Sequence, residues 1–262
     1  MDEPLRDFLT ISYNELEVLN LEAKKRRIEN FGKPDNKLKT FYTEYLKKEK
    51  RIKAVTVGFT DLEGKFQMLD YNKDYLLESS DNLTFDGSSV KGFTQVSESD
   101  LKLKLDWSSF YWLPSDIFGP GKVLLFAEIY TSDDMPHPSD FRSRLRTYLH
   151  ELYKKEKYLV MGANEIEGIL VEGLDAEMNF KEKPGFKLVS SGGYYHSLPL
   201  DRLRKFIDAT AEAHRALGFE NEKDHPEVAP SQFELNYKHS IADIAADQVQ
   251  LYKLVARQVA EI

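Results

Sequence analysis

The sequence contains no cysteine among its 262 residues. This absence excludes disulfides, thiolate nucleophiles and thiolate metal ligands, so any metal would have to be held by oxygen or imidazole ligands. Basic residues are also too few to balance the acidic ones, since 36 Lys and Arg against 44 Asp and Glu give a formal net charge of −8. A general nucleic-acid binder needs a basic surface that replaces counterions, and the composition therefore argues against that class.

Long hydrophobic runs are missing as well. No apolar stretch approaches the length that crosses a bilayer, and Met1–Pro4 does not open a signal peptide. We therefore expect a cytoplasmic protein with no membrane partner. The content of 41% hydrophobic and 31% charged residues is ordinary for a globular chain, and the length suits two structural units.

The N-terminal part predicts two helices followed by strands. Ser12 and Glu15 form a capping box at the start of the first helix, and the second helix follows Asp35 and Asn36, either of which could cap it. Ala54–Thr60 and Lys65–Leu69 read as two strands around a glycine turn, which predicts a β-hairpin. This part of the chain therefore combines helices with a sheet.

Three further segments complete the first half. Thr84–Ser89 is a loop by composition, with the common turn pair Asp86–Gly87 inside it. Lys122–Tyr130 is a strand with a nearly continuous apolar core. Met135–Pro138 contains two prolines in four residues, which suits a linker between domains.

Tyr158–Glu172 is predicted as one strand that carries two carboxylates. Glu165 and Glu167 are two residues apart and therefore share a face of that strand. Solvated acids on a surface strand are one interpretation. Because the neighbouring residues are strongly apolar, we expect instead a central, buried strand, where paired carboxylates are costly without counter-charge. Metal binding is the better interpretation.

Helices are predicted between and after these strands. Ser139 and Ser240 are the predicted N-caps of two of them. Another helix follows Pro199 and ends at Gly218, and His214 on this helix is expected to be structural or on the surface, and not a ligand.

Asp224–Tyr237 places Glu227 and Glu234 seven residues apart. After Pro230, polar and apolar residues alternate with the period of a half-buried strand, so one face presents Glu234 between two amides. On an unbroken strand the two glutamates would face opposite sides, but a break at Pro230 can bring them together. Two carboxylates aimed at one space repel each other unless a cation lies between them. The alternative is the solvated outer face of an edge strand.

Together, three motifs resemble the glutamine synthetase family. In chain order they are Phe85–Ser89 with Glu98–Leu103, which is similar to the family's N-terminal signature, Asn164–Glu167, similar to its paired-glutamate strand, and His225–Glu234, similar to its metal-ligand motif. Their order and separations fit the family too. The resemblance covers Ala54–Ile262.

The resemblance implies an α+β fold in three parts. Residues 1–53 would form a helical N-terminal extension, residues 54–135 a β-grasp domain, and residues 136–262 the first part of a catalytic domain with an antiparallel sheet flanked by helices. It also implies a ring-shaped homo-oligomer with the active site between neighbouring subunits. The Asp86 loop of one subunit would complete the carboxylate-lined cavity of the next.

The resemblance also assigns the carboxylates to two divalent ions, Mg²⁺ or Mn²⁺. Glu167, Glu227 and Glu234 would hold the first ion, and Glu165 would help to hold the second. Hard oxygen ligands suit such ions, which neutralise phosphate charges and align an in-line transfer.

The remaining matched positions concern substrates. Glu222 matches a position that contacts the nucleotide, ATP, and His225 one near the transferred phosphate. Asp86 matches the residue that binds ammonium and helps to deprotonate it. The implied reaction is the ATP-dependent ligation of ammonia to L-glutamate through γ-glutamyl phosphate. This reaction needs no covalent enzyme nucleophile, which agrees with the absence of cysteine.

Two departures from the family pattern matter. Pro226 stands where many members carry a second histidine. The sequence also stops before the segments that supply the rest of the second metal site, the glutamate site and most ATP contacts, so we expect a truncated portion that is inactive alone. Two alternatives stay open: a ligase that joins glutamate to another amine, and a non-catalytic assembly or regulatory module with the same fold.

Overall fold

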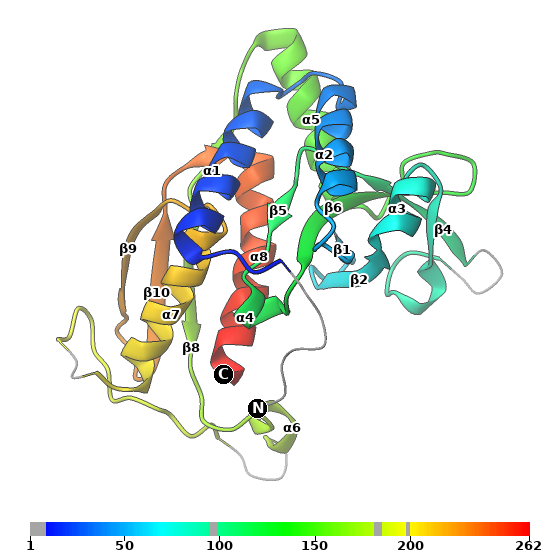
Figure 1. The fold of residues 1–262 in the computed structure, drawn as a ribbon. Helices are drawn as coiled ribbons and strands as arrows, with labels where there is room; N and C mark the ends of the chain where they lie inside the picture. Colours follow the sequence, from blue (N-terminus) through cyan, green and yellow to red (C-terminus); the bar gives the residue numbers. More distant parts are fainter. Residues whose placement is uncertain (1–8, 95–98, 181–184, 198–199) are drawn as a thin grey trace. The chain divides into compact units, whose positions relative to one another are not determined.

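The computed structural model describes residues 9–94, 99–180, 185–197 and 200–262. The chain divides into two compact units, Met1–Val160 and Met161–Ile262 (Figure 1). Both units combine helices with sheets, as the predicted α+β class requires. Among the described residues, no helix combines the length and the apolar character that crossing a membrane demands.

The first unit is built on a six-stranded sheet with the strand order β2-β1-β6-β4-β3 and with β5 paired to β6. The strands are β1 (Ala54–Thr60), β2 (Phe66–Asn72), β3 (Leu83–Asp86), β4 (Asp100–Leu105), β5 (Tyr111–Trp112) and β6 (Lys122–Tyr130). β1 and β6 are parallel, and the other pairs are antiparallel. The predicted hairpin is confirmed, because β1 pairs with β2 through a turn at Gly64, whose φ of 76° favours glycine.

The helical segments of this unit begin largely where the sequence provides caps. They are α1 (Tyr13–Glu29), α2 (Asn36–Lys48), α3 (Lys73–Ser79), η1 (Gly87–Ser89), α4 (Ser115–Phe118) and α5 (Phe141–Glu156). Ser12 caps α1 as predicted, since its side chain accepts a hydrogen bond of 3.3 Å from Glu15 N. Asn20 then ties α1 to β5 through two hydrogen bonds of 3.0 Å with the backbone of Trp112.

The predicted loop at Thr84–Ser89 is wrong for its first half. Leu83–Asp86 forms β3, and only Gly87–Ser89 leaves the strand as η1. The reason is tertiary, because Leu83 and Phe85 lie opposite Leu103 and Leu101 of β4 and complete the sheet. Pairing with a neighbouring strand overrides the local turn composition.

The predicted cap of α5 is also wrong by one residue. The N-cap is Asp140 and not Ser139, since Asp140 Oδ1 accepts from Ser143 N at 3.1 Å. The other carboxylate oxygen of Asp140 accepts from Ile129 N of β6 at 2.8 Å. This second bond ties the start of α5 to the sheet, which Ser139 could not do with one short hydroxyl.

Gly58 in β1 lies so close to the Phe66 ring that no side chain fits at position 58. A Cβ at this position would come within 2.2 Å of the Phe66 ring, which itself packs on Phe126 at 5.2 Å between ring centroids. Overpacking of this kind costs about 1–3 kcal/mol. We expect Gly58→Ala to lower the free energy of unfolding by that amount in urea titrations. Adding Phe66→Leu should recover part of the loss, and an unchanged stability of Gly58→Ala alone would contradict the contact.

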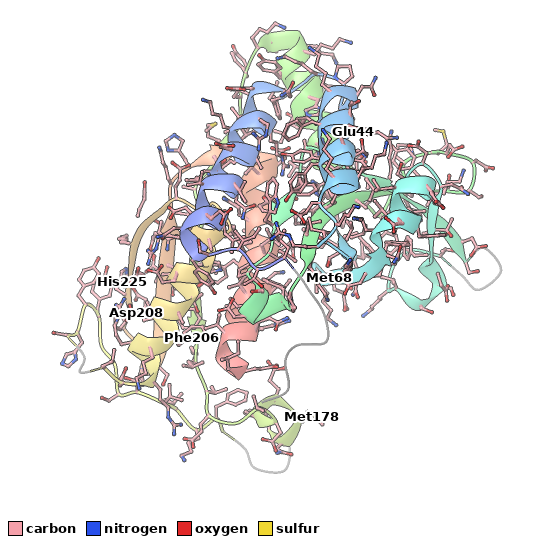
Figure 2. All side chains as sticks on the ribbon, in the orientation of Figure 1. Glu44, Met68, Met178, Phe206, Asp208 and His225 are labelled. Carbon is pink, nitrogen blue, oxygen red and sulfur yellow. The ribbon has the colours of Figure 1, made fainter. Side chains whose placement is uncertain are left out.

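The second unit contains a three-stranded antiparallel sheet in the order β8-β10-β9 and a small two-stranded sheet of β11 and β7. Its elements are β7 (Met161–Gly162), β8 (Glu165–Ile169), α6 (Ala176–Asn179), α7 (Arg202–Ala216), β9 (Asn221–Pro226), β10 (Gln232–Tyr237), β11 (Ser240–Ile241) and α8 (Ala242–Glu261). The Phe206 ring of α7, labelled in Figure 2, packs on Phe233 of β10 at 4.8 Å. Tyr252 of α8 donates to Ile166 O of β8 at 3.3 Å. These helices therefore cover one face of the sheet.

Two predictions in this unit are wrong. Tyr158–Glu172 is not one buried central strand, because β7 and β8 are separate and β8 is an edge strand of the three-stranded sheet. Its residues alternate between exposed and half-buried. Ser240 does not cap α8 either, since it pairs with Gly162 in β11, and the helix begins after Ile241 without a side-chain cap. Local apolarity does not reveal how many neighbours a strand has.

Beneath the sheet, His214 of α7 is completely buried, so of the two predicted positions, structural or on the surface, the structural one is correct. Its Nδ1 lies 2.6 Å from Tyr237 Oη, and its ring is stacked between Phe219 and Tyr252 at 4.9 and 4.7 Å. Burial lowers the pKa of His214 from 6.5 to about 3. The imidazole is therefore a neutral part of the core.

This depressed pKa predicts a dependence of stability on pH. Below pH 6.5 the unfolded chain takes up a proton that folded His214 refuses until about pH 3, so acid favours unfolding. We expect the free energy of unfolding to fall by up to about 1.4 kcal/mol per pH unit in this window. Urea titrations at several pH values should show a shallower slope for His214→Gln. His239→Gln, at an exposed histidine, should keep the wild-type slope, and equal slopes in all three proteins would contradict the argument.

Candidate metal centre

The hairpin of β9 and β10 brings the two motif glutamates together. The predicted break is present, because β10 begins at Gln232 after a turn that contains Ser231 at a φ of 60°. Glu227 N donates to Gln232 O, and Gln232 N donates to Ala229 O, at 2.9 and 3.1 Å. Glu227 therefore stands at the start of a tight turn, next to the strand that carries Glu234.

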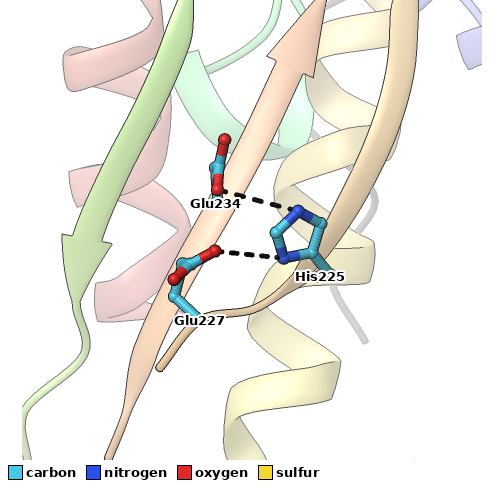
Figure 3. Close-up of side chains that lie close together, drawn as sticks. All are labelled: His225, Glu227 and Glu234. Carbon is cyan, nitrogen blue, oxygen red and sulfur yellow. Dashed lines mark ion pairs between the residues drawn. The ribbon is translucent and has the colours of Figure 1, made fainter. Parts of the chain in front are cut away.

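Strand register adds a histidine to this pair. Glu234 of β10 lies directly opposite His225 of β9 on one side and Glu167 of β8 on the other. Directly opposite residues of antiparallel strands share a face of the sheet. Figure 3 shows His225, Glu227 and Glu234 grouped in front of the strands, with helices behind. The group lies on the face that α7 and α8 leave open.

The three side chains converge on one small space. One ligand atom from each of His225, Glu227 and Glu234 lies within 4.8 Å of the other two. Among the described residues, no other group of His, Asp and Glu side chains meets this criterion. His225 Nδ1 is 3.7 Å from Glu227 Oε1, and His225 Nε2 is 3.7 Å from Glu234 Oε2 (Figure 3). All three residues are buried, with exposed fractions of 7, 8 and 9%.

Neighbouring groups hold each of these side chains in place. Asn236 Nδ2 donates to Glu234 Oε1 at 2.9 Å, and Val228 N donates to Glu227 Oε2 at 2.9 Å. His225 Nδ1 lies 3.0 Å from Pro226 O. A carbonyl oxygen only accepts, so Nδ1 is the donor in this contact, and it orients the ring with Nε2 towards Glu234.

The site gathers two carboxylates around one space. His225 Nε2 is buried without a hydrogen-bond partner and lies 3.7 Å from Glu234 Oε2. Two carboxylates around one space repel each other unless a cation lies between them. Carboxylate oxygens are the hard ligands that Mg²⁺ and Mn²⁺ prefer, and an imidazole nitrogen can join them, so these residues would hold part of the coordination shell of such an ion. The residues fit a divalent metal ion.

The paired glutamates of β8 lie near this group but outside it. Glu167 is exposed and accepts a hydrogen bond of 2.6 Å from Gln232 Nε2. Glu165 is also exposed and lies opposite Asn236, one step further along the same face. Their predicted shared face is confirmed by this register, whereas their roles as metal ligands stay predictions.

The two remaining predicted site residues are exposed. Glu222 occupies a register irregularity of β9, between the positions paired with Asn236 and Tyr237. Asp86 belongs to the first unit and accepts from Ser88 N, Ser88 Oγ and Ser89 Oγ at 2.6 to 2.9 Å. These hydrogen bonds hold the pKa of Asp86 below its ordinary value. Asp86 is therefore a fixed anion, and its predicted role towards ammonium stays a prediction.

Two tyrosines belong to the site although the sequence did not single them out for it. The rings of Tyr194 and Tyr195 lie 5.7 and 4.7 Å from the His225 ring, and Tyr194 Oη donates to Tyr195 Oη at 2.8 Å. This hydrogen bond, then desolvation, Tyr195 and the nearby carboxylates of Glu227 and Glu234, raise the pKa of Tyr194 to about 12. The available signal was an aromatic pair after a glycine pair, which has no defined chemistry by itself.

Comparison with known proteins identifies the family of this chain. The family model described as "Glutamine synthetase, beta-Grasp domain" matches residues 51–132, and "Glutamine synthetase, catalytic domain" matches residues 138–262. Glutamine synthetase of Thermotoga maritima is 32% identical over 81% of this chain and 47% of its own length. That of Methanosarcina mazei is 35% identical over 81% of this chain and 46% of its own length. The chain spans about half the length of these curated relatives.

Solved structures agree with the fold. A Plasmodium falciparum glutamine synthetase superposes with a TM-score of 0.68 at 19% identity, over 85% of this chain and 48% of that one. A GmaS/ADP complex superposes with a TM-score of 0.66 at 21% identity, over 84% and 49%. Part of the N-terminal signature, Glu98, lies outside the described residues. With both domain models matched in order, the chain belongs to the glutamine synthetase family and contains its β-grasp domain followed by catalytic-domain sequence.

Proposed function

We propose that this chain carries the first metal site of an ATP-dependent ligase that joins ammonia to L-glutamate through γ-glutamyl phosphate. The observation that carries the proposal is the buried group of His225, Glu227 and Glu234, in which two carboxylates and an imidazole converge on one space. The group lies in the segment that matches the catalytic domain of glutamine synthetase. A structural relative is a complex with ADP, which supports a nucleotide as co-substrate.

Glu227 and Glu234 would hold Mg²⁺ or Mn²⁺, with His225 and Glu167 as the neighbouring candidates for its remaining positions. Such an ion neutralises phosphate oxygens and aligns an in-line phosphoryl transfer. The contribution of the chain is to orient the ligands: Asn236 and Val228 N hold the two carboxylates, and Pro226 O holds the imidazole of His225. Glu165 would face the second ion from the same strand as Glu167.

The substrate roles follow the family positions. Glu222 would contact ATP, His225 would lie near the transferred phosphate, and Asp86 would bind ammonium and accept its proton. The fixed negative charge of Asp86 supports this last role. In the proposed assembly, a cytoplasmic ring of identical subunits, the Asp86 loop of one subunit completes the site of the next. We also propose that the catalytic domain of this chain begins at residue 136.

Calorimetric titration of Mn²⁺ into the purified chain tests the proposal. We expect saturable binding, and we expect its loss in Glu227→Gln, because the substitution removes one of two buried charges that the ion neutralises. We expect no glutamine formation from glutamate, ammonium and ATP by this chain alone, since it spans about half of the relatives' length.

The control is Glu220→Gln, which neutralises an exposed carboxylate of the same unit that pairs with Lys238 at 3.1 Å. It should leave Mn²⁺ binding unchanged. A folded chain that shows no saturable Mn²⁺ binding would refute the proposed metal site. The non-catalytic assembly module would then be the better interpretation.

A further inference from the structure

A segment that carries the two tyrosines of the site is attached to the β9–β10 turn through one hydroxyl group. Ser231 Oγ accepts from Val189 N at 2.8 Å and from Ser190 N at 2.9 Å. The same hydroxyl donates to Ser190 O at 3.2 Å. A serine hydroxyl offers one donor and two acceptor positions. Ser231 uses all three on the segment, and its side chain is completely buried there.

The backbone of Ser231 shows that the turn itself does not require this hydroxyl. Its φ of 60° lies in the left-handed region, where glycine is the favoured residue. The carbonyl of Ser231 accepts from Leu170 N, which follows β8, at 2.9 Å. The turn is thus held by its backbone, which a glycine would satisfy equally well. The hydroxyl is what a glycine could not supply, and it serves only the neighbouring segment.

That segment ends on the imidazole of the metal site. Tyr195 N donates to Pro226 O at 3.4 Å, next to the bond between this carbonyl and His225 Nδ1. The Tyr194 and Tyr195 rings stand nearly perpendicular to the His225 ring, at 88° and 75°. Both rings therefore pack against the imidazole, which is 7% exposed.

We propose that Ser231 is a positioning residue of the metal site, whose hydroxyl holds residues 189–195 on the hairpin so that the two tyrosines keep the His225 imidazole directed at Glu227 and Glu234. The inference rests on the proposed metal site. Ser231 acts through the segment and touches no ligand atom. Groups that orient a histidine beside a metal typically change the metal affinity by about 10–100-fold when they are removed.

The test is Ser231→Gly, because glycine keeps the backbone of the turn and removes only the hydroxyl. The probe is Tb³⁺, a hard cation whose emission is sensitised by nearby tyrosine. We expect the variant to bind Mn²⁺ and Tb³⁺ about tenfold more weakly by calorimetry. At saturating Tb³⁺ the sensitised emission of the variant should fall to less than about half of the wild-type value, because the rings of the two tyrosines move away from the bound ion. The amides of Val189 and Ser190 should exchange hydrogen about tenfold faster or more.

A double variant, Tyr194→Phe with Tyr195→Phe, identifies the source of the emission. It keeps both rings and should lose most of the sensitised signal while Tb³⁺ still binds. Wild-type affinity and emission in Ser231→Gly would overturn the Ser231 inference and leave the metal site standing. Absence of Mn²⁺ and Tb³⁺ binding in the wild type would overturn the metal site and the positioning role with it. Faster exchange at both amides with unchanged affinity would show a purely structural tie, which also overturns the inference.

Discussion

Replacement of Asp106 by Asn is expected to lower the free energy of unfolding of the first unit by about 3–5 kcal/mol. Asp106 follows β4 and is 1% exposed. Its Oδ2 pairs with Arg142 Nη2 at 2.6 Å and with Arg146 Nη1 at 3.2 Å, both on α5. Its Oδ1 accepts from Ser108 N at 3.1 Å and from Ser108 Oγ at 2.5 Å. One carboxylate therefore joins the sheet to a helix that presents arginines to it.

The size of the effect follows from what the substitution leaves behind. Burial alone would raise the pKa of Asp106, but the Arg146 and Arg142 guanidinium groups hold it well below its ordinary value. An amide cannot balance these groups, and removing one partner from a buried ion pair strands the other charges away from water. Arg146 also pairs with Glu128 of β6, which balances only part of the charge. The loss should therefore exceed that of any surface ion pair in this unit.

Thermal and urea unfolding of Asp106→Asn would measure this loss. The matched control is Asp134→Asn, which breaks the 2.7 Å ion pair with Lys102 at a carboxylate whose side chain is 77% exposed. Exposed pairs contribute about 0–1 kcal/mol, so the control should stay close to wild type. Equal losses in the two variants would refute the idea that α5 is held through a buried charge.

The first half of the fold was predictable where the sequence marks its own boundaries. The hairpin of β1 and β2 and the strand β6 are confirmed because alternation and a turn glycine specify them locally. The polar attachment of α5 was not predictable in this way. Arg142 and Arg146 lie one helical turn apart and look like a solvated face, and Asp106 lies 36 residues before the first of them. Only the packed structure shows that the three share one site.

The metal centre shows the same division. Glu227 and Glu234 could be paired from the sequence, because a proline break between them permits a hairpin. The approach of His225 depends on which residue lies opposite Glu234, and strand register is set by pairing and not by composition. The tyrosine pair comes from a segment about 30 residues earlier, attached by Ser231. A motif therefore identifies the carboxylates, whereas the groups that orient them are long-range contacts.

The exposed edge strand β8 has a further consequence for the paired glutamates. The sequence predicted that Glu165 and Glu167 are buried, yet both are exposed at the edge of the sheet. Exposed carboxylates retain most of their hydration and interact weakly with a distant charge. The depth of a carboxylate should therefore rank its importance for the first metal ion.

We accordingly expect Glu234→Gln, like Glu227→Gln at the similarly buried neighbour, to lose at least about a hundredfold in Mn²⁺ affinity. Glu234 is the central residue of the row, with His225 on one side and Glu167 on the other, and Asn236 already fixes its carboxylate. Glutamine keeps the shape of the side chain but removes the charge that the ion neutralises. Glu165→Gln is the matched control on the same face, and we expect a change below about threefold because it is exposed and one step away.

A third variant, Glu167→Gln, decides how the ion is shared across the row. In the structure Glu167 accepts from Gln232, so it must give up this hydrogen bond of 2.6 Å before it can bind the ion. We expect an intermediate loss of about tenfold, as for a group that completes a site without forming its centre. A loss as large as that of Glu234→Gln would show that Glu167 moves fully into the first site, as the family motif implies. Calorimetric affinities that are the same in all three variants would mean that the ion binds elsewhere, because no arrangement centred on Glu234 survives the removal of its charge.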